Sequence, residues 1–258
     1  MKKLLQNKNL QHLLWIVLLL CVWQVVHLSG VVSPLLLPGL GEVAAEFARA
    51  IAGGELPSQV GLSLLLILAG LAVAVALALV LGFASLYSRV FASFADTLCM
   101  LAHPLPAIAL LPLIIVWFGV GPPAIIAIIA HSAAWPLLLN LTTGFAEVPR
   151  VYLETARSLG LRRGAMLVRI YLPASVPYLL AGCKTAWARA WRALISAEML
   201  FGAVAASGGI GWYIFKSRVM MNTPGLFAGI LVVICIGVVV DSLLRTVEAR
   251  TIRRWSAV

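Results

Sequence analysis

Four charged residues interrupt one apolar segment, residues 177–201, at Lys184, Arg189, Arg192 and Glu198. An ionised side chain at the centre of a bilayer costs about 2.5 to 3.5 kcal/mol even on the scale derived from membrane insertion, so these groups should face protein or water. Three cations against one carboxylate leave an excess of positive charge. A cationic, water-filled passage would suit an anionic solute.

On a helix these side chains fall on two faces. One face carries Lys184, Trp191 and Glu198 at 100° per residue. The other carries Arg189, Arg192 and Ser196, about a quarter-turn or more away. We interpret five residues as candidates for lining the path of a solute: Arg189, Arg192, Ser196, Glu198 and Trp191. The alternative is that the two arginines bond to helix carbonyls or to a neighbouring subunit, while Lys184 extends towards the inner surface.

Other residue types that carry chemistry are scattered. His103 and His131 each stand alone, and we expect hydrogen-bonded helix residues rather than ligands. The cysteines have no C-x-x-C spacing and should be small buried apolar residues: Cys21, Cys99, Cys183 and Cys235. The glycine-rich SGGIGW at 207–212 lacks a following G-K-[ST], so it predicts no ATP site. We therefore predict no catalytic site, metal or cofactor on this chain.

The composition indicates which elements must position these residues. With 62% hydrophobic and 11% charged residues, the chain of 258 residues is far more apolar than a soluble domain. Six apolar stretches are long enough to cross about 30 Å of hydrocarbon. They lie at roughly 13–32, 62–87, 97–118, 122–144, 177–201 and 226–247. We predict one all-α membrane domain over residues 1–258.

The distribution of basic residues indicates the orientation of these spans. If the start of the chain is cytoplasmic, thirteen Lys and Arg residues lie inside and three lie outside, at Arg49, Lys216 and Arg218. Cytoplasmic loops carry such an excess of basic residues, so both termini should be cytoplasmic. The formal charge of +10 then needs no nucleic acid to explain it.

Small and cyclic residues predict how the spans pack. Gly70, Ala74, Ala78 and Gly82 recur every four residues, which lets another helix approach closely. Prolines should bend the third and fourth spans, at Pro104, Pro106, Pro112 and Pro136. The carbonyls that they free must find partners within the protein or in a watery cavity. A short surface helix, with a solvated face, is expected within the outer loop 33–61.

The largest cytoplasmic loop contains ETARSLGLRRGAMLVRIYLP, residues 154–173. A helix opened by Pro149 should end at Gly160, which suits the left-handed residue beyond a helix C-terminus. We expect a second short helix at 162–170, stopped by Pro173. The alternative is that the basic residues here simply face lipid headgroups.

The spacing within this loop resembles a known signature. The pattern E-A-A-x3-G-x9-I-x-L-P marks the permease subunits of ATP-binding-cassette (ABC) importers, and only Thr155 departs from it. It is matched at Glu154, Ala156, Gly160, Ile170, Leu172 and Pro173. PLPAIALLPLIIVWFGVG at 104–121, NLTTG at 140–144, AWRALISAEML at 190–200 and GIGW at 209–212 resemble the nitrate, taurine and aliphatic-sulfonate branch. Departures at Leu66 and in HSAAWP at 131–136 bear on the substrate rather than the fold.

The resemblance implies a type I importer permease that moves a small anion by alternating access. Segment 150–164 would be the coupling helix that contacts a separate ATPase, which binds ATP and Mg. The contact residues would be Tyr152, Glu154, Thr155, Ala156, Arg157, Ser158, Leu159, Gly160, Leu161 and Arg162. A second permease copy and an extracytoplasmic solute-binding protein would complete the assembly in a bacterial inner membrane.

Other functions remain open at this point. A permease of the same type could carry a different small organic solute. A self-sufficient ion-coupled carrier would need protonatable groups at the membrane centre, for which His103, His131 and Glu198 are candidates without a repeated pattern. A membrane enzyme acting on lipid would need a catalytic cluster that the sequence lacks.

Overall fold

The computed structural model describes residues 8–205 and 208–255, with side chains described for 10–202 and 208–251. Predicted cytoplasmic residues Lys2 and Lys3, and the side chains of Lys8, Arg253 and Arg254, lie outside this part of the chain. The first helices are α1 (Lys8–Leu28), α2 (Leu40–Ala52), α3 (Glu55–Tyr87), α4 (Arg89–Ala102), η1 (Ala107–Leu110), α5 (Leu111–Phe118) and α6 (Pro122–Ala146). They are followed by α7 (Arg150–Ser158), α8 (Arg163–Met166), η2 (Leu167–Tyr171), α9 (Leu172–Ala205), α10 (Ile210–Val219) and α11 (Thr223–Trp255). Every regular element in these ranges is helical, which confirms the predicted all-α class.

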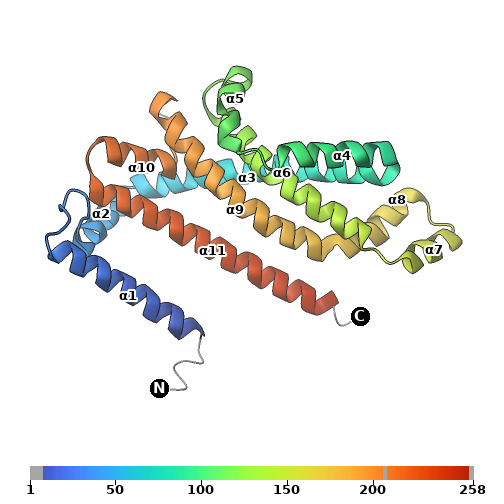
Figure 1. Ribbon diagram of the computed structural model, residues 1–258, viewed down its shortest axis with the longest axis horizontal. Coiled ribbons are helices and arrows are strands. Elements are labelled where there is room, and N and C mark those ends of the chain that lie inside the picture. Colours follow the sequence, from blue (N-terminus) through green and yellow to red (C-terminus); the bar gives the residue numbers. More distant parts are fainter. Residues whose placement is uncertain (1–7, 206–207, 256–258) are drawn as a thin grey trace.

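Five helical segments are long and apolar enough to cross a membrane: Leu10–Leu28, Glu55–Tyr87, Pro122–Ala146, Arg163–Gly202 and Thr223–Thr251. Each covers most of one predicted span. A sixth span exists if α4 and the η1–α5 segment are counted together. Figure 1 shows α2 and α10 at one end of the elongated molecule and α7 and α8 at the other.

The third span differs from the continuous helix predicted at 97–118. Its first part begins earlier, at Arg89, and the pair is bent by 93° at residues 103–106. Pro104 and Pro106 cause the break because neither supplies a backbone N–H and each restricts the residue before it. Pro112 falls in the first turn of α5, where proline is tolerated, and so causes no kink. In Figure 1, α5 stands away from the line of α4. We call residues 103–106 the elbow.

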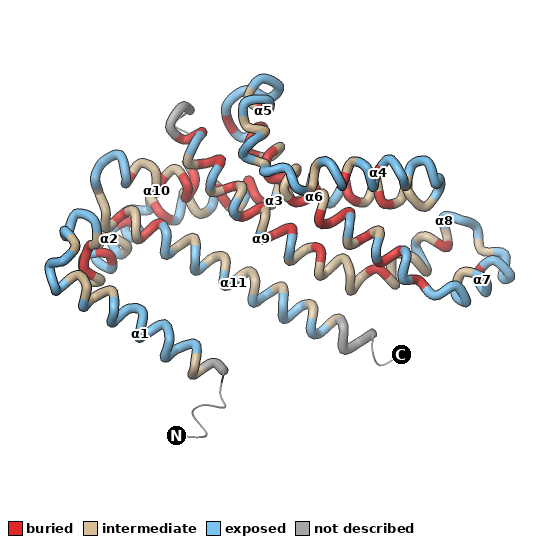
Figure 2. Tube along the Cα trace, in the orientation of Figure 1, coloured by how far each residue is buried: buried red, intermediate tan, exposed pale blue. Residues whose placement is uncertain are grey.

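The core lies where α3, α6 and α9 pack together. Buried positions run along α6 and α9, whereas α1 is mostly exposed (Figure 2). The predicted stripe of small residues on α3 is buried and faces α6. A Cβ at Gly82 would lie 2.6 Å from Cδ2 of Leu141, and one at Gly70 would overlap Ile129. Close packing through small residues is therefore confirmed.

The helix that contains α9 begins earlier in the sequence than the predicted span at 177–201. Pro173 does not stop it, because α8, η2 and α9 form one continuous helix from Arg163 to Gly202. The π-helical turn η2 precedes the proline, and the Leu172 N–H bonds to the carbonyl of Leu167, five residues back. This wider turn accommodates a ring that would clash with the carbonyl four residues back in a regular α-helix.

The expected surface helix in the outer loop is α2. Its start is closed by Glu42, whose Oε2 accepts from the Gly39 N–H at 3.0 Å. Its solvated face is only partly as predicted, because Glu46 Oε1 accepts a hydrogen bond from Asn222 Nδ2 at 2.9 Å. The helix is thereby tied to the turn that precedes α11.

Candidate functional site

The predicted coupling segment folds as a short helix with a defined end. Gly160 has a φ of +70°, the left-handed conformation that the sequence predicted. The Gly160 N–H bonds to the Arg157 carbonyl at 2.9 Å and the Leu161 N–H to the Ala156 carbonyl at 3.0 Å. These two bonds form a Schellman motif, which satisfies carbonyls at the end of α7 and turns the chain towards α8.

The side chains of α7 divide into one anchor and a mostly exposed remainder. Ala156 is 4% exposed, whereas Tyr152 and Leu159 are 62% and 73% exposed. The remaining candidates are exposed or, for Leu161, half-buried: Glu154, Thr155, Arg157, Ser158, Gly160, Leu161 and Arg162. Val151 adds a further apolar side chain that is 68% exposed. Exposed apolar residues grouped on a small helix mark a surface that another protein can cover.

A cavity of about 430 Å³ lies beside α7. Leu86 and Tyr87, at the end of α3, line it together with residues that follow α7. Arg157 and Leu161 form the wall that belongs to the coupling segment. The coupling segment therefore lies close to the end of α3 and to the start of the helix that follows this segment.

A second cavity, of about 450 Å³, contains the predicted arginines. Its lining comes from the elbow and η1, from α6 and from α9. The polar side chains among them are His103, His131, Ser132, Trp135, Arg189, Arg192 and Ser196. None of its lining residues is Asp or Glu. We call this the cationic cavity.

Arg189 is bound to the elbow. Its Nη1 donates to the His103 carbonyl at 3.3 Å, and its Nη2 lies 3.1 Å from Nε2 of the same residue. Because a guanidinium only donates, Nε2 must be the acceptor, and the neutral ring carries its proton on Nδ1. Arg189 therefore bonds to a backbone carbonyl, as in the alternative role, although His103 lies just beyond the end of α4 rather than within a helix.

His131 contacts a second carbonyl of the elbow, that of Leu105. Trp135 Nε1 donates to Nδ1 of His131 at 3.2 Å, so the proton of the neutral ring lies on Nε2. That nitrogen faces the Leu105 carbonyl at 3.4 Å. Both histidines are thus hydrogen-bonded, as predicted, and the His103 and Leu105 carbonyls of the elbow both meet side chains of other helices.

Arg192 is the more accessible cation of the cavity. Its Nε donates to the Ala188 carbonyl at 3.0 Å, one turn earlier on α9. Among the described residues, no hydrogen bond or ion pair engages its two terminal nitrogens. Ser196 lies one turn further along α9, is also exposed, and lines the same cavity.

Two predicted path residues lie elsewhere, which corrects their assignment. Glu198 is fully buried and accepts from Ser63 Oγ at 2.7 Å and from the Gly211 N–H at 2.9 Å. Trp191 is 6% exposed and stacks on Trp187, with ring centroids 5.7 Å apart. The helical wheel separated two faces of α9 but did not show that this one packs inside the protein.

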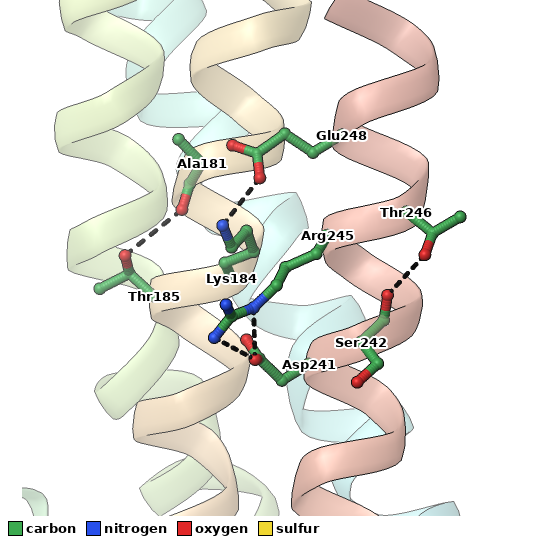
Figure 3. Close-up of polar contacts among 8 residues, drawn as sticks. All are labelled: Ala181, Lys184, Thr185, Asp241, Ser242, Arg245, Thr246 and Glu248. Atoms are coloured by element: carbon green, nitrogen blue, oxygen red, sulfur yellow. Dashed lines mark hydrogen bonds and ion pairs between the residues drawn. The ribbon is translucent and has the colours of Figure 1, made fainter. Parts of the chain in front are cut away.

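Lys184 is paired rather than extended towards the surface. Its Nζ lies 2.7 Å from Oε2 of Glu248 on α11 (Figure 3). One turn earlier on α11, the predicted pair of Asp241 and Arg245 is confirmed at 2.7 Å. The unbalanced cations of α9 are therefore the two arginines of the cationic cavity.

Sequence reasoning missed two polar contributors to this cavity. Ser132 and Trp135 line it from α6. The spacing of His131 and Trp135, four residues apart on a helix, was a usable signal for a hydrogen bond between them. Nothing in the local sequence indicates that Ser132 faces the same space.

Comparisons with known proteins agree with these features. Residues 74–253 match the family model "Binding-protein-dependent transport system inner membrane component". SsuC of Bacillus subtilis, named as an aliphatic sulfonates transport permease, is 29% identical over 92% of this chain and 84% of its own. The taurine transport system permease TauC of Escherichia coli is 29% identical over 90% of this chain and 85% of its own.

The fold also resembles that of a solved protein. A chain of the MetNI methionine ABC transporter, in an inward facing crystal form, superimposes with a TM-score of 0.51. The match covers 84% of this chain and 96% of that chain, at 17% sequence identity. It supports the helical architecture alone.

Proposed function

The chain belongs to the family of binding-protein-dependent transport system inner membrane components, and on that premise we propose that it passes a small anion through an ATP-driven importer. A sulfonate, taurine or nitrate is the proposed class of cargo. The relatives named for aliphatic sulfonates and taurine support this class. The observation that carries it is the cationic cavity, whose ionised lining residues are Arg189 and Arg192.

The proposed role of α7 is to couple this chain to a separate ATPase. Val151, Tyr152 and Leu159 provide an exposed apolar surface on a helix whose end is fixed by Gly160. ATP and Mg would be bound by the partner, so this chain would make and break no bonds. Closure of the ATPases would displace α7 and, through the adjoining cavity, the ends of α3 and α8.

The remaining partners follow from the same proposal. Two copies of this chain would form the pathway, with a solute-binding protein at the end where α2 and α10 gather. Both termini and α7 would face the cytoplasm. The position of α7 and α8 at the opposite end of the molecule from α2 and α10 is consistent with this orientation (Figure 1).

Reconstitution tests the proposal. We expect proteoliposomes that contain the permease, its ATPase and its binding protein to accumulate radiolabelled taurine or alkanesulfonate only when ATP is supplied to the ATPase. Vesicles with the permease and binding protein, but without the ATPase, are the control. Uptake at the full rate in those control vesicles would contradict an ATP-driven mechanism.

A further inference from the structure

The elbow depends on side chains from other helices. Pro104 and Pro106 interrupt the helix, and the carbonyls of His103 and Leu105 lie in this interruption, where each meets a side chain of another helix. Arg189 from α9 bonds the first carbonyl, and His131 from α6 faces the second. Bonds across to α9 and α6 therefore hold the two ends of the 93° bend in place.

The Arg189 contact is the weaker kind that a guanidinium makes. Both of its acceptors on His103, a carbonyl at 3.3 Å and a ring nitrogen at 3.1 Å, are neutral. A sulfonate or nitrate presents two charged oxygens to the same planar fork. An ionised acceptor adds Coulomb attraction to the hydrogen bonds of the guanidinium, and the paired geometry adds to it.

An anion that enters the cationic cavity meets Arg192 as well. Arg192 is exposed and lies one turn from Arg189 on α9, so one anion is within reach of both guanidinium groups. The hydroxyl groups of Ser132 and Ser196 line the same space as additional donors. An anion held here would compete with His103 for the donors of Arg189.

We propose that an oxyanion bound in the cationic cavity replaces His103 as the hydrogen-bond acceptor of Arg189. The elbow then loses its bonds to α9, so that cargo binding changes the angle of α5. This inference rests on the proposed function, because it assigns the same cavity to the cargo. The last turn of α5 makes few contacts with the rest of this chain, since Val116, Trp117 and Phe118 are 79%, 66% and 51% exposed. Arg189 is then a cargo-binding residue, and His103 competes with the cargo for its N–H groups.

The experiment measures the distance from α5 to α9 across the elbow as a function of anion concentration, and so reports the bend and the anion affinity together. Spin labels are attached at Val116→Cys on α5 and Leu200→Cys on α9, in full-length permease that lacks Cys21, Cys183 and Cys235. The protein in lipid nanodiscs is titrated with methanesulfonate, nitrate or sulfate at constant ionic strength, with gluconate as the balancing ion. Pulsed electron paramagnetic resonance gives the distance between the labels. We expect at least one of the three anions to shift this distance.

Variants separate competition from simple packing. His103→Ala removes the ring acceptor, so half of the shift should require about ten-fold less anion, the size expected for one hydrogen bond to a charged group. His103→Gln keeps an acceptor oxygen and should respond like the unmodified protein. Arg189→Gln should show the shifted distance without any anion. Arg192→Gln should keep the original distance and need at least about ten-fold more anion.

The outcomes decide between the two proposals. The inference is overturned if none of the three anions changes the label distance in the unmodified protein. It is also overturned if His103→Ala needs the same or a higher anion concentration for half of the shift. If His103→Ala does not fold, an unshifted distance in anion-free Arg189→Gln overturns it instead. ATP-driven uptake with an immobile elbow overturns the inference alone. A mobile elbow without ATP-driven uptake overturns the importer proposal alone.

Discussion

Lys184 on α9 and Glu248 on α11 form an ion pair of 2.7 Å whose side chains are 29% and 23% exposed. The pair joins two helices through residues that lie 64 positions apart in the sequence. It removes one of the cations that a count along α9 leaves unbalanced. Among the described cations of α9, those without an acidic partner are therefore the two arginines of the cationic cavity.

Breaking this pair should destabilise the protein. Lys184→Met leaves the Glu248 carboxylate partly buried without its partner, and we expect a loss of about 1 to 2 kcal/mol. The double variant with Glu248→Gln should recover part of this loss. Thermal unfolding in detergent, analysed as a double-mutant cycle, measures the coupling. Arg245→Met, which breaks a more exposed pair within α11, is the matched control and should cost about 0.5 kcal/mol or less.

Glu198 should matter for structure rather than for anion selection. Glu198→Ala removes the acceptor of both Ser63 and the Gly211 N–H, leaving buried donors unpaired at about 1 to 3 kcal/mol each. We expect lower thermal stability and less assembled complex. Uptake per assembled complex should keep its preference among anions. A changed preference at normal stability would return Glu198 to the solute path.

Glycine at position 70 should be required for the contact between α3 and α6. A Cβ there would overlap Ile129, so Gly70→Ala should cost about 1 to 3 kcal/mol in the free energy of unfolding. Shortening the opposing side chain with Ile129→Ala should relieve part of that strain. Gly61→Ala is the control within the same helix, because no atom lies within 4 Å of its added Cβ. It should be neutral or slightly stabilising.

Gly160 should be needed for binding of the ATPase. Gly160→Pro is incompatible with a φ of +70° and removes the N–H that bonds to Arg157. The variant should insert into the membrane but lose most ATPase in co-purification. Gly160→Ala, with a strain of about 1 to 2 kcal/mol, should show a partial loss. Gly164→Ala is the control, since its added Cβ meets open space. Unchanged co-purification of Gly160→Pro would remove α7 from the contact.

The arginines should affect transport more than assembly. In the variant with Arg189→Gln and Arg192→Gln, the cationic cavity loses both ionised residues, and we expect uptake of taurine or alkanesulfonate to fall at least ten-fold. The amount of complex with the ATPase should change much less. Uptake assays on equal amounts of purified complex provide the measurement. Normal uptake in this variant would exclude the cavity as the anion path.

Local signals predicted a large part of the fold. The small residues that recur every four positions from Gly70 to Gly82 identified the helix face that contacts α6, because close approach requires small side chains in register. Gly160 identified the end of α7 because few other residues adopt its conformation at low cost. Long apolar segments identified five of the helices, since each needs about 20 residues to cross the membrane.

Features that depend on distant contacts were not predictable. Pro104 and Pro106 indicated a bend, but its angle is fixed partly by Arg189, which follows His103 by 86 residues. Periodicity placed Glu198 on a polar face and could not reveal Ser63, which lies 135 residues earlier. Pro173 does not end a helix here because a π-helical turn absorbs it, an adjustment without a sequence signal of its own.

The segment from Arg163 to Gly202 is one continuous helix of 40 residues, about 60 Å long at 1.5 Å per residue. One end adjoins the end of α7, and the other carries Glu198, whose carboxylate accepts a hydrogen bond from the Gly211 N–H in the first turn of α10. If α7 binds the ATPase as proposed, a displacement of α7 can reach the opposite end of the molecule through this one continuous helix. Such a displacement does not need a series of side-chain rotamer changes between the two ends of the molecule.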